Sequence, residues 1–249
     1  MINFFTFKWG TKYNYIYVNR LYNSLKKHCK QTFSFTCITD NPKNIKDQIN
    51  IIDFKEFNYF IDCPPGRLFT KEKTILFKLY NQGTNILLDL DILIHNNLNF
   101  LDNISLKKPI FIWNYWDWLK PHYYDKITNI HSEKSALHVF GKLNCVYMNS
   151  SFVAWKDKSA EFIFDNLYNK RKYAYYVYNS LDRYLFYQHW RKNQLDFWPK
   201  EIFYTYNFEK VPYTFKSNYK ICLFNNSHGN GYDLHQTSGW SKTIWDSYD

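Results

Sequence analysis

The feature that most constrains this chain is a pair of aspartates, Asp89 and Asp91, in the otherwise apolar run 86–94, Ile-Leu-Leu-Asp-Leu-Asp-Ile-Leu-Ile. A run this apolar predicts a strand buried on both faces of a sheet, and an ionised aspartate is almost never fully buried without a partner. Desolvating two like charges one residue apart is costly unless something neutralises them. The partner that suits two hard oxygen ligands is Mg²⁺ or Mn²⁺, itself bridging to phosphates.

The same pair predicts where a ligand would bind. We expect Asp89 at the carboxyl end of the strand and Asp91 just beyond it, which is where open α/β sheets bind their ligands. The sequence therefore points to chemistry on a nucleotide diphosphate.

Strands and helices are expected to alternate over the first hundred residues, which predicts a parallel α/β sheet. In this half the expected strands are 2–7, 33–39, 49–54 and the run with the aspartates, and the expected helices are 13–29 and 70–80. In the second half the expected strands are 109–114, 145–155 and 220–224, and the expected helices are 159–170 and 181–190. No domain boundary is visible, so we expect one domain over residues 1–249.

Composition indicates which kinds of binding partner and which cellular compartment suit this chain. The 249-residue chain has a formal net charge of +10, which favours anionic partners. Its five cysteines are an odd number without CxxC spacing, which indicates reduced thiols and predicts a cytoplasmic protein. We expect no signal peptide at the N-terminus, and no eighteen apolar residues run together, so no transmembrane segment is expected.

Further motifs accompany the aspartate pair. They are Gly10-Thr11-Lys12-Tyr13, Thr39-Asp40, Lys73-Thr74-Ile75-Leu76-Phe77, Asn149-Ser150-Ser151-Phe152, Asp182-Arg183 and His228-Gly229. With these motifs nearly the whole chain resembles the GT-A glycosyltransferases, especially the glycogenin-like (family 8-like) branch and related short bacterial and viral sugar transferases. The aspartate pair and the His-Gly motif are the most specific parts of the resemblance.

The resemblance implies a GT-A-like α/β fold, with a mostly parallel central sheet flanked by helices. It implies a hexosyltransferase-like enzyme (EC 2.4) that moves a sugar from a nucleoside diphosphate donor, a UDP-sugar being expected, to a glycan, glycolipid-type or other hydroxyl acceptor. The glycogenin-like branch favours retention of anomeric configuration. The cofactor implied is Mn²⁺ or Mg²⁺, held by Asp89, Asp91 and His228, with Asp89 binding either the metal or the ribose.

The resemblance also implies a set of residues that bind the donor: Phe7, Gly10, Thr11, Tyr13, Asp40, Lys73, Asp89, Leu90 and Gly229. Tyr13 either stacks on the base or is a core aromatic on a helix face. Ser151 stands where the family has Gly, and Arg183 where it has Gln. No Lys-Pro follows His228-Gly229, so a phosphate-binding lysine usual there is missing, and Lys8, Lys12 and Lys73 are the candidates to replace it.

Two acceptor-side features each have a structural alternative. Asp182 is the candidate catalytic carboxylate or acceptor-binding group, and the alternative is that it caps a helix N-terminus. The run 113–118, Trp-Asn-Tyr-Trp-Asp-Trp, suits a wall on which a sugar stacks, and the alternative for Trp113 is core packing.

Two other functions stay open at this point. A HAD-type phosphatase also places Asp-x-Asp after an apolar strand and would use Asp89 as nucleophile. Its motif normally opens the domain and carries Thr or Val where Leu93 stands here. A non-catalytic, basic nucleic-acid-binding module would need cations clustered with exposed aromatics, and it leaves the aspartate pair unexplained. We therefore expect no nucleic-acid partner.

Overall fold

The fold was analysed in a computed structural model, which describes residues 1–60, 62, 70–114, 148–178, 180–190, 192–206, 214–224 and 234–249. In the first half its elements are β1 (Ile2–Lys8), α1 (Tyr15–His28), β2 (Phe33–Thr39), β3 (Asn50–Asp53), α2 (Ile75–Leu79), β4 (Thr84–Leu88), β5 (Ile92–Ile94) and β6 (Ile110–Trp113). The rest are β7 (Met148–Lys156), α5 (Glu161–Asn169), α6 (Arg171–Val177), α7 (Leu181–Leu185), β8 (Asp196–Phe197), β9 (Phe203–Thr205), β10 (Ile221–Leu223) and α8 (Trp240–Asp246).

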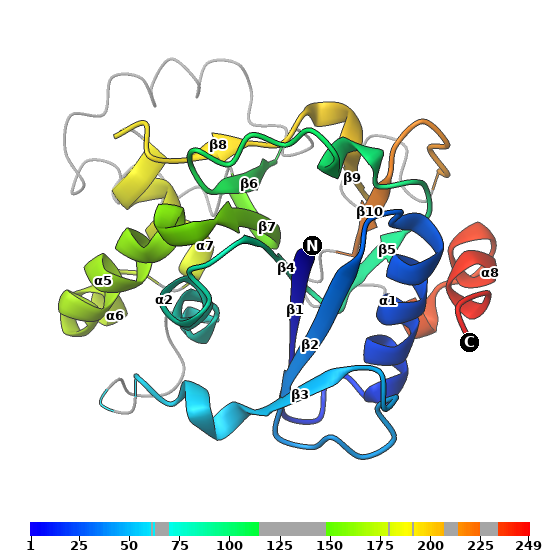
Figure 1. Cartoon of the computed structure of the whole chain (residues 1–249), viewed down its shortest axis with the longest axis horizontal. Coiled ribbons are helices and arrows are strands. Elements are labelled where there is room, and N and C mark those ends of the chain that lie inside the picture. Colours follow the sequence, from blue (N-terminus) through cyan, green and yellow to red (C-terminus); the bar gives the residue numbers. More distant parts are fainter. Residues whose placement is uncertain are drawn as a thin grey trace.

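A seven-stranded sheet in the order β3-β2-β1-β4-β7-β6-β8 forms the centre of the molecule (Figure 1). Strands β3, β2, β1 and β4 are parallel, β7 runs antiparallel to β4, and β6 and β8 are parallel to each other. Three short strands in the order β5-β10-β9 make a second sheet. The architecture confirms the predicted α/β fold with a mostly parallel sheet flanked by helices.

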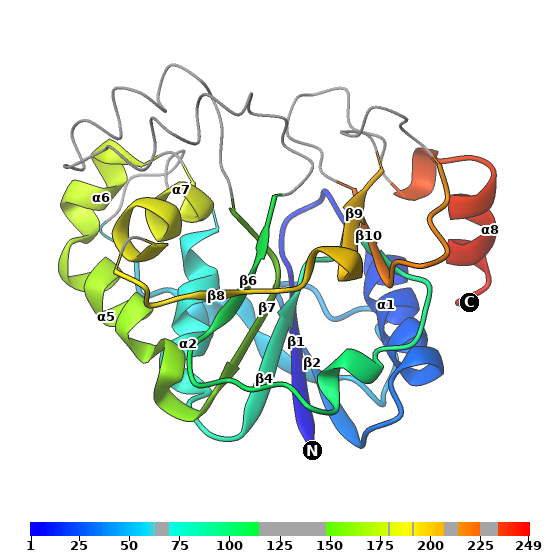
Figure 2. The same cartoon turned by 90° about the horizontal axis from the view of Figure 1, so that it is seen from above.

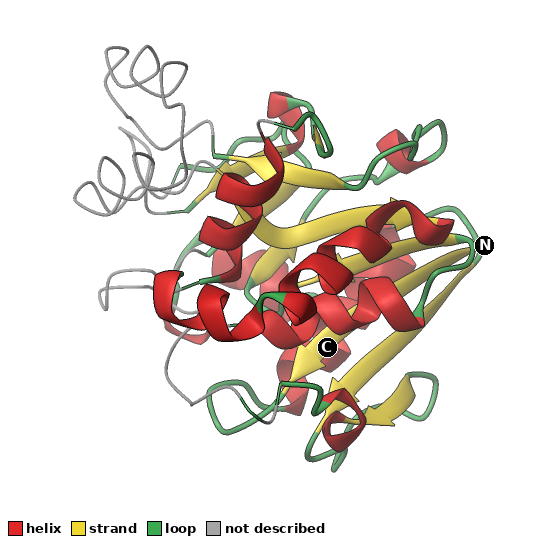
Figure 3. Ribbon diagram, turned by 90° about the vertical axis from the view of Figure 1, so that its left-hand side faces the viewer, coloured by secondary structure: helices red, strands yellow, loops and turns green. Residues whose placement is uncertain are grey.

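Helices cover both faces of the central sheet. In Figures 1 and 2, α1 and α8 lie on one side of β1 and β4, and α2, α5, α6 and α7 lie on the other. Each face of the sheet has its own hydrophobic core, and successive residues of β1 point alternately into one and the other. Phe4 packs in the core beneath α1, and Phe5 packs in the core beneath α2 and α5. This is the period of two that a strand buried on both faces requires. Figure 3 shows the twist of the resulting sheet.

Residues 86–94 do not form one strand, which corrects the sequence-based expectation. Strand β4 ends at Leu88 in the large sheet, and β5 begins at Ile92 in the small one. The backbone between them is fixed at both ends: Asp89 N–H donates to Ser151 O over 2.9 Å, and Phe224 N–H donates to Asp91 O over 3.0 Å. The reason for the break is that two carboxylates cannot stay inside a doubly covered strand, so the chain leaves the core where they begin.

Most other elements lie where the sequence predicts them. Helix 70–80 is shorter than expected, because Lys71–Thr74 form a 3₁₀ turn before α2. The expected helix at 181–190 continues past α7 as a π-helix over Phe186–Trp190. Four elements, α6, α8, β8 and β9, were not anticipated from the sequence, because each is too short to give a clear periodic signal. No helix in the described part of the chain has the length and apolarity that crossing a membrane requires.

The C-terminal residues tie α1 to the small sheet. Arg20 on α1 makes ion pairs with Asp246 over 2.8 Å and with Asp249 over 2.7 Å. The hydroxyl of Tyr248 donates to Ile94 O at the end of β5 over 2.6 Å, and it lies 2.9 Å from Nε2 of His28. The strand that leads away from Asp91 is thus held at its far end by this segment.

We expect the Tyr248→Phe variant to lower the free energy of unfolding by about 1–2 kcal/mol, because the Ile94 carbonyl is left buried without its donor. Urea denaturation followed by circular dichroism measures this change. Tyr173→Phe, whose side chain on α6 is 53% exposed, is the matched control and should change stability little. Equal stability of the Tyr248→Phe variant and the wild type would show that the hydroxyl does not anchor β5.

Candidate active site

A cavity of about 290 Å³ opens at the carboxyl ends of β1 and β4. Its walls come from the end of β1, the turn before α1, the start of the 3₁₀ turn before α2, and the crossing between β4 and β5. The lining residues are Phe7, Trp9, Lys12, Tyr13, Thr70, Lys73, Asp89, Leu90 and Asp91. The predicted donor residues Phe7, Tyr13, Lys73, Asp89 and Leu90 are therefore brought together with Asp91 around one cavity.

Each aspartate has its own partner in the cavity. Nζ of Lys73, which is buried, lies 2.5 Å from Oδ1 of Asp89. The hydroxyl of Tyr13 donates to Oδ2 of Asp91 over 2.9 Å. A buried lysine of this kind makes the ionised form of Asp89 tolerable, whereas Asp91 has only a neutral hydrogen-bond donor.

The charge on Asp91 is poorly compensated. Burial, and then repulsion from Asp89, raise the pKa of Asp91 from 3.8 to about 6. The positive charge of Lys12, the hydrogen bond from Tyr13 and the positive charge of Lys73 act in the opposite direction without cancelling this rise. Asp91 therefore carries a negative charge that the surrounding protein does not fully stabilise, which is the condition under which a cation is attracted.

The turn after β1 is shaped by Asp40. Gly10 has φ +67°, a left-handed conformation that glycine adopts without strain, and its N–H donates to Oδ2 of Asp40 over 2.8 Å. The buried Lys8 lies 4.0 Å from Oδ1 of the same carboxylate. Gly10, Asp40 and the exposed Thr11 do not line the cavity. Gly10 and Asp40 instead fix the turn that presents Trp9, Lys12 and Tyr13.

Asp182 lies next to this cavity without lining it. The N-cap of α7 is Ser180, whose side chain accepts from Arg183 N–H over 3.4 Å, so the alternative that Asp182 caps the helix is wrong. Instead the carboxyl group of Asp182 accepts hydrogen bonds from the side chain and backbone of Ser150 on β7, and it is close enough to Lys73 and Asp89 to feel their charges.

One carboxylate oxygen of Asp182 receives no hydrogen bond from the described residues. Its Oδ1 is buried and has no hydrogen-bond partner among the described residues. Burial raises the pKa of Asp182 above its usual value, and the bonds from Ser150 act against that rise. A buried carboxylate oxygen without a donor is rare in folded proteins and commonly marks a functional group.

Some predicted residues lie outside the described part of the chain. These are His228, Gly229 and positions 115–118 of the aromatic run. Trp113 is described: it is buried and packs edge-on against Phe197, as the core-packing alternative requires. Phe224, the last described residue before 225–233, is the one whose N–H bonds to Asp91 O.

The described residues include two carboxylates that could serve as metal ligands. No group of three or more His, Cys, Asp or Glu side chains within the described ranges is arranged to hold an ion. Two carboxylates nevertheless suit Mg²⁺ or Mn²⁺, because such ions are commonly held by one or two carboxylates together with substrate phosphates. The poorly compensated charge of Asp91 also suits a divalent cation of this kind.

Three residues near the site were not singled out from the sequence. Trp9 lines the cavity and stacks on Phe54 with ring centroids 5.1 Å apart. Its signal, visible only in retrospect, is its place in the turn after the first strand. Thr70 has φ +65°, which is strained for a β-branched residue and has no sequence signature. Ser150 lies in a sequence motif, but only the fold brings it within hydrogen-bonding distance of Asp182.

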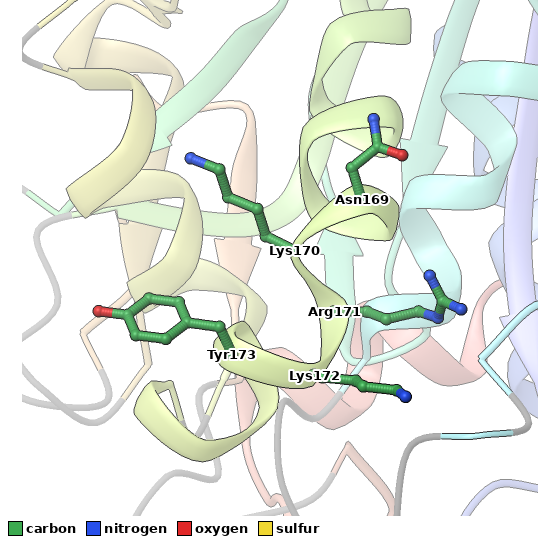
Figure 4. A pocket seen from close by; sticks show the side chains of 5 residues that line it. All are labelled: Asn169, Lys170, Arg171, Lys172 and Tyr173. Atoms are coloured by element: carbon green, nitrogen blue, oxygen red, sulfur yellow. The ribbon is translucent and has the colours of Figure 1, made fainter.

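A second, more open pocket of about 530 Å³ lies where α5 meets α6 (Figure 4). Asn169, Lys170, Arg171, Lys172 and Tyr173 line it, and the side chains of Lys170 and Arg171 point in opposite directions. Arg171 is engaged with Asp62, with Nε 2.9 Å from its carboxylate. The lining includes no carboxylate, so this pocket lacks the chemistry of the cavity at β4.

Comparison with known proteins supports the fold. No protein-family model matches the sequence, and no curated protein is significantly similar to it. Among solved structures, the galactosyltransferase LgtC in complex with donor and acceptor sugar analogs matches with a TM-score of 0.62 and 11% identity, covering 99% of this chain and 95% of that one. Mouse xyloside xylosyltransferase 1 in its apo form matches with a TM-score of 0.54 and 10% identity, covering 90% and 97%.

A third match is the apo structure of the bifunctional glycosyltransferase WbbM, with a TM-score of 0.58 and 10% identity. It covers 98% of this chain and 51% of that one. The matches confirm the predicted fold: this chain has the GT-A fold of sugar transferases. At these identities the likeness establishes the fold, and function has to be argued from the site.

We expect Asp91→Asn to raise the free energy of unfolding of the ligand-free protein by about 1–3 kcal/mol at pH 7.5, because it removes a charge that the folded state disfavours. Because the folded-state pKa of Asp91 is raised to about 6, the penalty develops between about pH 4 and pH 6 and is complete above that. The gain should therefore shrink by roughly half at pH 5.

Thermal unfolding of both proteins across this pH range measures the difference. Asp47→Asn, which removes an exposed carboxylate, is the matched control and should shift the melting temperature little at any pH. A loss of stability in the Asp91→Asn variant at pH 7.5 would contradict the interpretation of Asp91 as a poorly compensated charge.

Proposed function

We propose that this protein is a metal-dependent glycosyltransferase that moves a sugar from a nucleoside diphosphate donor, a UDP-sugar by resemblance, to a hydroxyl acceptor on a glycan or glycolipid-type molecule. The observation that carries the proposal is the pair Asp89 and Asp91, at the crossing between the two sheets and at the wall of the cavity in a GT-A fold. LgtC, whose structure matches this chain, is a galactosyltransferase that was crystallised with donor and acceptor sugar analogs.

The charges of the cavity support a divalent cation. The charged side chains that line it are Lys12, Lys73, Asp89 and Asp91, two positive and two negative. A nucleoside diphosphate sugar brings two further negative charges, so a dication restores neutrality in the loaded site. Asp89 and Asp91 would hold the cation, and His228 is proposed as the third ligand. The chemistry that the bound cation supplies is stabilisation of the negative charge that develops on the departing diphosphate.

The other residues bind and orient the donor. Tyr13, held through its hydroxyl on Asp91, offers its ring to the base, and its hydrogen bond fixes the rotamer of that carboxylate. Lys73 adds positive charge beside the diphosphate from a buried position. Asp40 supports the turn at Gly10, and Gly229 is proposed to let the backbone approach the pyrophosphate.

Asp182 is the proposed catalytic or acceptor-side carboxylate. Ser150 fixes its orientation, and its other oxygen, Oδ1, has no protein donor among the described residues and is thus available to a substrate hydroxyl or to the reacting sugar. The glycogenin-like resemblance favours retention of configuration. A cytoplasmic location remains a prediction from the cysteine pattern.

The two alternatives are less well supported. A phosphatase with Asp89 as nucleophile normally carries the Asp-x-Asp motif after the first strand of its domain and has Thr or Val where Leu93 stands, whereas here the motif follows β4. A nucleic-acid-binding module needs exposed aromatics beside cations on one face, whereas most described aromatic rings pack in the two cores. Neither alternative accounts for the matches to sugar transferases.

We expect wild-type protein to bind its preferred nucleoside diphosphate in MnCl₂ and to lose most of that affinity in EDTA. Asp91→Asn should weaken binding in MnCl₂ by about tenfold or more, because it removes a charged ligand. Calorimetric titration measures both effects, with Asp47→Asn as the control. Metal-independent binding, unchanged in Asp91→Asn, would contradict the metal site. Hydrolysis of p-nitrophenyl phosphate by wild type, lost in Asp89→Asn, would instead favour the phosphatase.

We expect Asp182→Asn to reduce turnover by roughly 10²-fold or more while changing nucleotide affinity little. The physical reason is that asparagine keeps the shape and can still accept from Ser150 but carries no charge. A screen of nucleotide sugars against glycan acceptors in MnCl₂ identifies the substrates, and initial rates then compare the variants. Ser180→Ala, which removes the helix cap alone, should lower stability without a comparable loss of turnover. Wild-type turnover in Asp182→Asn would remove Asp182 from the site.

A further inference from the structure

We propose that Lys12 is the mobile phosphate-binding cation of the donor site: its ammonium group leaves the ring of Tyr13 and pairs with the donor diphosphate when the nucleotide binds. The inference rests on the proposed function, which supplies the diphosphate. It assigns the role of the phosphate-binding lysine that the sequence lacks after His228-Gly229.

Three lysines lie near the carboxyl end of β1, and two of them already have carboxylate partners. Lys73 is buried and pairs with Asp89 over 2.5 Å. Lys8 is also buried and lies 4.0 Å from Asp40, on a carboxylate that fixes the Gly10 turn. Moving either ammonium group onto a phosphate would leave a carboxylate without its cation, and Lys8 does not line the cavity.

Lys12 differs from both. It is exposed, it lines the cavity, and no carboxylate lies within ion-pair distance of it in the described part of the chain. Its Nζ lies over the ring of Tyr13, 4.5 Å from the centroid. An exposed cation–π contact is weaker than a charge-assisted hydrogen bond to phosphate, so exchanging the first for the second is favourable.

Lys12 also lies near both of the groups proposed to contact the base and the bound cation. The ring that it covers belongs to Tyr13, whose hydroxyl bonds to Asp91, and Lys12 is close enough to Asp91 to favour its charged form. An ammonium group in this position lies over the ring proposed for the base and near the carboxylate proposed for the cation. A diphosphate, which lies between the base and the bound cation, must pass within reach of the Lys12 ammonium group. When that ammonium group moves onto the diphosphate, it uncovers the face of the Tyr13 ring.

The test is a titration of Lys12→Met, Lys12→Arg and wild type, in MnCl₂, with UDP, GDP, ADP, CDP and dTDP. Methionine keeps an unbranched chain over the ring and removes the charge. For the diphosphate that wild type prefers, we expect Lys12→Met to weaken binding by about tenfold and Lys12→Arg to restore most of it. Binding of the corresponding nucleoside, followed by ligand-observed nuclear magnetic resonance, should not be weakened by either substitution, because a nucleoside carries no phosphate for Lys12 to bind.

Lys107→Met is the matched control, because this exposed lysine precedes β6, which runs parallel to β1 and β4, and so lies at the end of the strands opposite to the cavity. It should bind the diphosphate as wild type does, which excludes an effect of net charge alone. Wild-type diphosphate affinity in Lys12→Met would overturn the role of Lys12 and leave the proposed function standing. An equal loss of diphosphate and nucleoside would also overturn it, since Lys12 would then serve the base. Failure of wild type to bind any of the five diphosphates would overturn the proposed function, and this inference with it.

Discussion

The cost of burying two carboxylates that are separated by one residue organises this structure. Asp89 and Asp91 follow a strand that is covered on both faces, and neither charge can remain in that environment. The chain therefore leaves the large sheet at Leu88 and enters the small one at Ile92, with Leu90 buried between the two acids. Four residues contact this crossing: Lys73 pairs with the first acid, Tyr13 donates a hydrogen bond to the second, and Ser151 and Phe224 bond to the backbone.

The sequence predicts the sheet, its helices and the place of the acids, because each of these follows from a local pattern. Strand 33–39 alternates apolar and polar residues, and α1 shows a regular spacing of apolar residues. Local pattern does not show that 86–94 divides between two sheets, since the apolar run continues across the break. The division depends on hydrogen bonds from Ser151 and Phe224, which are remote in sequence.

The same limit applies to the site. Tyr13, Lys73 and the two aspartates, which the sequence assigns to one donor site, line a single cavity, because each stands in a recognisable motif at a strand or helix end. It does not distinguish Gly10 and Asp40, which shape the turn, from Lys12 and Trp9, which face the cavity. Nor does it show that Ser180 caps α7 and so leaves Asp182 available to Ser150, a matter decided by how α7 packs on β7.

The contacts that keep Asp91 in its unfavourable position lie away from the cavity. Asp91 is held in a state that burial and Asp89 both oppose, so the fold must oppose any movement of the backbone that would relieve it. Strand β5, which follows Asp91, is paired with β10 along its length, and Ile94 at its end is bonded by Tyr248. Tyr248 in turn belongs to a segment joined to α1 through Arg20, and α1 begins just after Tyr13. Tyr13, just before α1, and Phe224, just after β10, both bond to Asp91, and the same set of contacts therefore holds both of them in place. This closed path of contacts holds a locally unfavourable pair of charges in place at the wall of the cavity.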